Sequence, residues 1–147
     1  MAASILALSV AAITQSVVTG QQQTYEALHD LRAVSLAESL LEEIMALPYA
    51  DPDGASAAGP DAGEAARADF DNADDFHGYS EPLGLTTDIA GQAYPSTFAR
   101  FGRDVTATYT TADSLGQTRP GLLVVITVTD ERDRMWTVQR FIVEPTP

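Results

Sequence analysis

Cysteine and lysine are both absent from this chain of 147 residues. Without cysteine there is no disulfide framework, no thiolate metal centre and no cysteine nucleophile. All eight basic residues are arginine, against 21 aspartates and glutamates, and the formal net charge is -13. A chain this acidic offers no attraction to a phosphate backbone, so we expect no direct binding to nucleic acid.

The recognised catalytic spacings are missing as well. The sequence contains no phosphate-cradling glycine loop and no motif that pairs a nucleophile with a base. A hydrolase built on carboxylates is the one enzyme class that composition leaves open. The two histidines, His29 and His77, are far apart in the sequence, and we assign them structural or surface roles. We therefore predict a protein that is not an enzyme and that has no cofactor.

Charged side chains are also missing from residues 1–25. The apolar run ends near Val18, and its roughly 18 residues are at the short end of the length that spans a bilayer. A secretory signal and a buried core helix are the alternatives, but a signal peptide needs a basic region before its apolar run. We predict that residues 1–23 form the membrane or filament-core half of a helix, in which Ala3, Ala7 and Ala11 permit close helix packing.

Residues 24–47 contain neither proline nor glycine and are rich in leucine, alanine and glutamate, which predicts that the helix continues. Its apolar residues recur at steps of three and four, which predicts one buried stripe: Ala33, Leu36 or Ala37, Leu40, Ile44 and Leu47. A helix from Ala2 to Leu47 is roughly 70 Å long, more than a domain of this size covers. Its N-terminal half therefore needs another partner.

The rest of the chain divides into an acidic loop and a sheet. We predict that Pro48 ends the helix and that residues 48–97 form the loop. From residue 98 to 144 the apolar period is two, which predicts at least three antiparallel strands. Arg103 and Arg140 fall on apolar strand faces, so each is expected to pair with a carboxylate or to extend toward water. The predicted fold is α+β, with a globular head over residues 24–147 in which the helix covers the sheet.

This order of elements resembles type IV pilins and the pseudopilins of type II secretion. The segments Ala37–Pro48 and Asp69–Tyr79 are similar to those of minor pilins in the pilus-modification and MSHA-biogenesis group. The resemblance implies a non-enzymatic subunit that assembles through its N-terminal helix with other pilin-like subunits and inner-membrane assembly components. It implies an inner-membrane prepilin with a periplasmic head that later enters a pilus or pseudopilus. The alternative is an exported acidic binding module that its helix anchors in the membrane.

The processing signature of that family has no counterpart in this sequence. It comprises a basic leader, a glycine before the cleaved bond, then phenylalanine and a glutamate. Met1–Leu8 looks like the family's helix beginning about eight residues late, so we expect the leader and junction to lie upstream. With that segment restored, the apolar run reaches about 25 residues, which is long enough to span a membrane.

The acidic loop contains the only metal site that the sequence suggests. Asp69, Asp71, Asp74 and Asp75 offer the hard oxygen ligands that calcium prefers. Some pseudopilins hold calcium in a loop, so the resemblance points the same way. The regular EF-hand spacing is not met, because Ala73 occupies the place of a third oxygen ligand. A solvated acidic loop without metal is the alternative.

Overall fold

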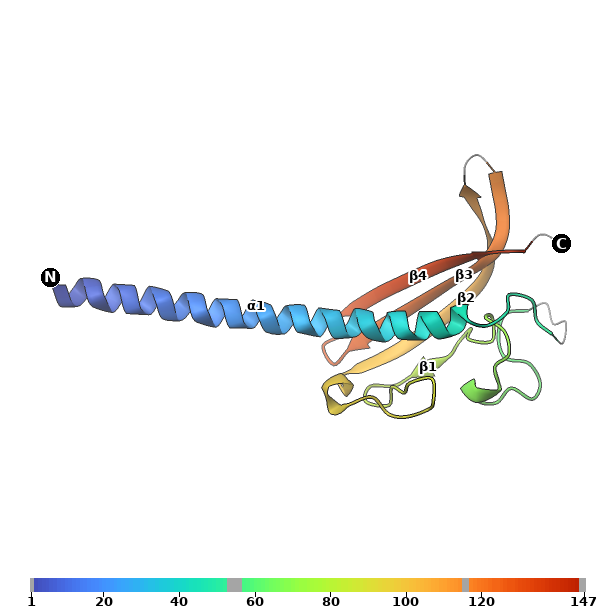
Figure 1. The fold of residues 1–147 in the computed structure, drawn as a ribbon, viewed down its shortest axis with the longest axis horizontal. Coiled ribbons are helices and arrows are strands. Elements are labelled where there is room, and N and C mark those ends of the chain that lie inside the picture. The colour runs from blue at the N-terminus through green and yellow to red at the C-terminus, as the bar shows by residue number, and fades with distance from the viewer. Residues whose placement is uncertain (1, 53–56, 115–116, 146–147) are drawn as a thin grey trace. The chain divides into compact units, whose positions relative to one another are not determined.

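The computed structural model describes the backbone of residues 2–52, 57–114 and 117–145, and side chains from Gln15 onward except that of Ser114. Its regular elements are one α-helix, four strands and two short 3-10 helices: α1 (Ala2–Met45), η1 (Arg67–Asp69), β1 (Ser80–Glu81), η2 (Ser96–Phe98), β2 (Phe101–Ser114), β3 (Gln117–Asp130) and β4 (Met135–Val143). The strands form one antiparallel sheet in the order β1-β2-β3-β4. The α+β class is therefore confirmed (Figure 1).

The helix ends within two residues of the predicted position. After Met45 the last turn tightens, with the Leu47 N–H donating to the Ile44 carbonyl at 3.2 Å. Pro48 follows and cannot donate a helical hydrogen bond. Within the region predicted as loop, 48–97, the structure adds the two-residue strand β1, which is too short to show an alternating pattern.

The chain divides into two compact units, residues 1–32 and 33–147, which are described separately. The first unit is helical from Ala2 onward. The side chains of Ala3, Ala7 and Ala11, predicted to mediate helix packing, lie outside the described residues. From Gln15 to Leu28 every side chain is exposed. Within the described part of the chain, no helix combines the length and apolarity needed to cross a membrane.

The second unit has one hydrophobic core between the last turns of α1 and one face of the sheet (Figure 1). The predicted helix stripe is buried in this core, with Leu47 packed at its margin. The sheet contributes alternate residues of β2 and β3, among them Val105, Ala107, Leu122, Val124 and Ile126. Both periodicities that were read from the sequence, three to four in the helix and two in the strands, are confirmed.

The strand register explains which residues face the helix. Val105 pairs with Ile126, and Ile126 pairs with Val138 across the next ladder. Paired residues lie on the same face of a sheet, so these three positions form one apolar row. A tight hairpin joins β3 to β4: Asp130 Oδ1 accepts from the Arg132 and Arg134 N–H groups, and Asp133 has φ of 58°.

Candidate functional site

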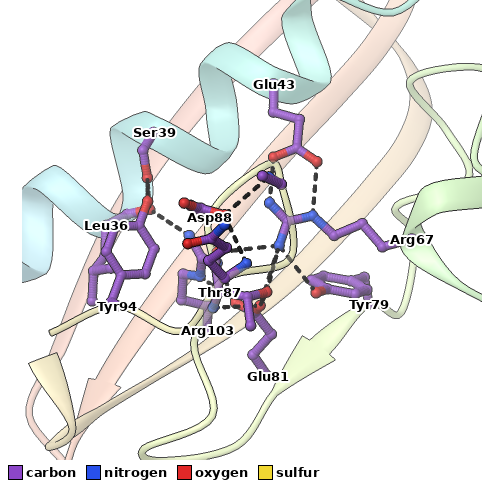
Figure 2. Close-up of polar contacts among 12 residues, drawn as sticks. Leu36, Ser39, Glu43, Arg67, Tyr79, Glu81, Thr87, Asp88, Tyr94 and Arg103 are labelled. Carbon is purple, nitrogen blue, oxygen red and sulfur yellow. Dashed lines mark hydrogen bonds and ion pairs between the residues drawn. The ribbon is translucent and has the colours of Figure 1, made fainter. Parts of the chain in front are cut away.

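Arg103 on β2 is the centre of a buried polar network. Its side chain is 1% exposed. Nε donates to Glu81 Oε2 at 2.5 Å, Nη1 to the Leu36 carbonyl at 3.1 Å and Nη2 to the Thr87 carbonyl at 2.7 Å. One guanidinium thus joins α1, β1 and the segment that follows β1 (Figure 2). The expectation that Arg103 pairs with a carboxylate is confirmed, whereas Arg140 is exposed.

Arg67, the single arginine of the acidic region, extends this network to a second point on the helix (Figure 2). Its Nε donates to Glu43 Oε1 at 2.7 Å, and Nη1 lies 3.2 Å from Glu81 Oε1. The guanidinium also lies over the Tyr79 ring, 5.7 Å from its centroid. Burial alone lowers the pKa of Arg67, but the hydrogen bonds to Glu43 and Tyr79 outweigh it and raise the pKa above its ordinary value.

Glu81 links the two arginines. It accepts from both guanidinium groups and also from Thr87, through the backbone N–H at 3.0 Å and Oγ1 at 2.7 Å. Two arginines and two glutamates balance in charge, and buried charges are tolerated when they are paired and hydrogen-bonded in this way. The network therefore joins the C-terminal part of α1 to β1 and to the segment that follows β1.

The acidic loop is folded by its own side chains. Asp75 Oδ2 accepts from the N–H groups of Asp71 and Asn72, each at 3.0 Å. Asn72 Oδ1 accepts in turn from the N–H groups of Asp74 and Asp75 at 2.9 and 3.2 Å. Short polar side chains commonly replace backbone partners in turns like this one. Asn72 and Asp75 are therefore structural parts of the loop.

The same loop is docked on the edge of β2. Gly78 donates to the Val105 carbonyl at 3.0 Å, and the Val105 N–H donates to the Tyr79 carbonyl at 2.9 Å. The Ala107 N–H donates to Nδ1 of His77 at 3.3 Å. The histidine thus takes the place of a strand partner, in agreement with the structural role expected for it.

The four aspartates proposed as calcium ligands do not gather in one place. Asp71 and Asp75 lie with Glu64, with one carboxylate oxygen of each within 4.8 Å of the others. Asp69 instead accepts from the Ala66 N–H, at 3.1 Å, and Asp74 is oriented toward Tyr109. Because Glu64 precedes the aspartate run by several residues, sequence spacing gave no signal for it. Calcium binding stays a prediction.

Glu64 shows the effect of this crowding. The Asp61 N–H donates to Glu64 Oε2 at 2.8 Å and by itself lowers the pKa of the carboxyl. Desolvation and the neighbouring Asp75 and Asp71 carboxylates outweigh that hydrogen bond, so the pKa of Glu64 is raised overall. Like charges so close together favour the protonated form of one of them.

Asp74 carries the pH dependence that we expect to be easiest to detect. Burial raises the pKa of its carboxyl above 3.8, so over the window just above 3.8 the folded chain binds more protons than the unfolded chain. The Asp74 contribution to stability is therefore present at low pH and is lost as pH rises through that window. Asp74→Asn should become progressively more stable than the parent protein across it, as measured by urea unfolding at several pH values. Asp104→Asn, at an exposed strand position, is the control. Parallel curves for Asp74→Asn and the parent protein would contradict the assignment.

No protein-family model matches this chain, and no curated protein or solved structure is significantly similar to it.

Proposed function

We propose that this chain is a non-enzymatic minor pilin or pseudopilin, a subunit of a type IV pilus or type II secretion pseudopilus. The observation that supports this proposal most is the exposure of apolar side chains along α1 before Ala33. These large side chains have exposed fractions from 43% to 73%: Val17, Val18, Tyr25, Leu28 and Leu31. Large apolar side chains exposed along one helix are typical of a surface that binds another molecule.

The helix offers a simple route from membrane to filament. An apolar helix can lie in a bilayer before assembly and among equivalent helices afterwards, and transfer between the two environments changes little hydrophobic free energy. Lipid supplies no net hydrophobic force between helices, so close packing of small residues favours association. In this proposal the subunit resides in the inner membrane with a periplasmic head, and its partners are other pilin-like subunits and assembly components.

The buried network attaches the sheet and the acidic loop to the C-terminal part of this helix. Arg103 and Arg67 contact α1 at the Leu36 carbonyl and at the Glu43 carboxylate, on consecutive parts of its buried face. A subunit held in a filament by its helix must keep its head attached to that helix under load. Charged groups that are fully paired inside the head suit this role, because breaking one of them leaves its partner buried and unpaired.

Photo-crosslinking in the native host tests the proposal. Benzoylphenylalanine replaces Val18 on the exposed helix, or Thr108 on the outer face of β2 as a control. We expect irradiation to join the Val18 variant to other pilin-like chains, identified by mass spectrometry, in a pattern that the Thr108 variant does not give. A Val18 variant that reacts only with lipid would instead support the membrane-anchored binding module. A variant that yields no specific product contradicts both.

A further inference from the structure

The β2–β3 hairpin extends past the last turn of α1 (Figure 1). A hollow of about 450 Å³ is lined by residues of this hairpin and of neighbouring segments. It lies between the segment after the helix and the ends of β2, β3 and β4, and its lining is Tyr49, Ala50, Asp51, Tyr109, Thr110, Pro120, Gly121 and Glu144. Among these described residues two are acidic and none is basic. The hollow is separate from the ion-pair network and from the Glu64 cluster, with which it shares no residue.

Two tyrosine rings form its aromatic wall. The rings of Tyr49 and Tyr109 lie 6.1 Å apart at an interplanar angle of 83°, an edge-to-face arrangement. Tyr109 is 39% exposed, so part of its ring is accessible from the hollow. The face of an aromatic ring attracts a cation, and more strongly when the cation is partly desolvated.

Asp74 adds a buried negative group behind this wall. Its side chain is 3% exposed, and Oδ1 has no hydrogen-bond partner among the described residues. The carboxylate does not line the hollow itself, but it lies close enough to Tyr109, Tyr49 and Asp51 to act on them electrostatically, so it adds negative potential behind the aromatic wall. A buried charge without a partner is costly, and a cation bound nearby reduces that cost.

The pKa shifts of Tyr109 and Tyr49 agree with a net negative potential in the hollow. Burial, followed by the Asp74 carboxylate, raises the pKa of Tyr109. Burial and then Glu144 and Asp74 raise the pKa of Tyr49. In each case the nearby charges oppose the formation of another anion. A bound cation reverses this effect.

We propose that this hollow binds the cationic end of an arginine or lysine side chain presented by a partner protein. The ammonium or guanidinium group lies against the Tyr109 ring near Asp51 and Glu144, with the Asp74 carboxylate behind the ring, and the aliphatic stem packs on Tyr49 and Pro120. Such side chains have an apolar stem and a charged end, which matches the mixture of aromatic and acidic groups here. This binding does not require that the chain assemble into a filament.

Titration of the full chain with small blocked amino acids tests this site. The probes are N-acetyl-arginine methylamide and N-acetyl-lysine methylamide, with the uncharged citrulline and ε-acetyl-lysine analogues as controls, at about 0.15 M salt to screen weak surface attraction. Tyrosine fluorescence and NMR shifts of the tyrosine rings report binding. We expect saturable binding of the cationic probes and none of their neutral analogues.

Three variants decide whether the response comes from this hollow. Glu144→Gln and Asp74→Asn should each weaken the affinity for the cationic probes by about threefold to tenfold, within the range of partly buried charge interactions. Asp104→Asn removes the same charge from the outer face of β2 and should leave the affinity unchanged. Binding that is absent, that the neutral analogues share, or that all three variants weaken equally overturns the proposal.

Discussion

Arg103→Met is expected to cost about 3 to 5 kcal/mol of the free energy of unfolding. Methionine fills much of the same volume but cannot donate. Glu81, 6% exposed, loses one of its two guanidinium partners, and the carbonyls of Leu36 and Thr87 lose a donor. The network keeps two glutamates against one arginine, and this excess negative charge in the interior is far more costly than a missing contact at the surface.

The control for this prediction is Arg100→Met. Arg100 pairs with Glu131 at 3.0 Å, but the two side chains are 63% and 43% exposed. Exposed pairs contribute about 0 to 1 kcal/mol, so this variant should unfold nearly as the parent protein does. Urea denaturation of both variants, followed by circular dichroism, measures the difference. Equal losses in the two variants would show that burial of the Arg103 network contributes nothing.

A double variant separates the lost charge pair from the lost packing. Arg103→Met combined with Glu81→Gln leaves one arginine, Arg67, against one glutamate, Glu43, and the amide oxygen at position 81 can still accept from Arg67 and Thr87. Residues that share one network do not contribute additively, so the double variant should lose less than the sum of the two single losses. Simple additivity would mean that Arg103 stabilises the protein only through its packed side chain.

The spacing of apolar residues predicted the helix and strands that build the core. It did not predict the buried ion pairs, because their members are brought together by contacts between distant parts of the sequence. The stripe through Leu36, Leu40 and Ile44 and the alternation of β3 follow from residue spacing and are buried as expected. Arg103 is conspicuous in the sequence because it interrupts an apolar strand face. Glu81 and Arg67 were not linked to it, because both lie in a segment without periodicity whose partners are far away in the sequence.

The acidic loop shows a different limit. Aspartate is a calcium ligand in some loops and a substitute for backbone partners in others, and the residue type is the same in both cases. Here Asp75 accepts from two backbone N–H groups, and Asp74 is buried near Tyr109, a residue that no local spacing links to it. The sequence therefore predicted where the acidic loop lies. It did not predict which of its carboxylates fold the loop and which lie near other parts of the chain.

Asp74 links stability to the proposed binding of a cation. Because burial raises the pKa of its carboxyl, the charged form destabilises the free protein at neutral pH. The same charge strengthens the interaction with a cationic side chain in the hollow. Asp74→Asn should thus raise stability while it lowers affinity, a combination that is typical of functional sites and that a purely structural residue does not give.

Leu40→Ala and Leu31→Ala make the same chemical change on one helix and should have opposite consequences. Leu40 is 0% exposed in the core against the sheet, so its truncation should cost about 2 to 5 kcal/mol of the free energy of unfolding. Leu31 is 64% exposed, and its truncation should change that free energy by no more than about 0.5 kcal/mol. Urea denaturation of the two purified variants measures both values.

For assembly into filaments, the substitution at the exposed Leu31 should have the more specific effect. If α1 packs on other pilin-like helices as proposed, Leu31 becomes buried there, and Leu31→Ala should reduce the amount of this protein recovered in sheared filaments while its cellular level stays normal. Leu40→Ala should lower the cellular level itself, because a head with a cavity under its sheet unfolds more often and is degraded. A Leu31→Ala protein that enters filaments as well as the parent protein would mean that this part of the helix surface is not an assembly contact.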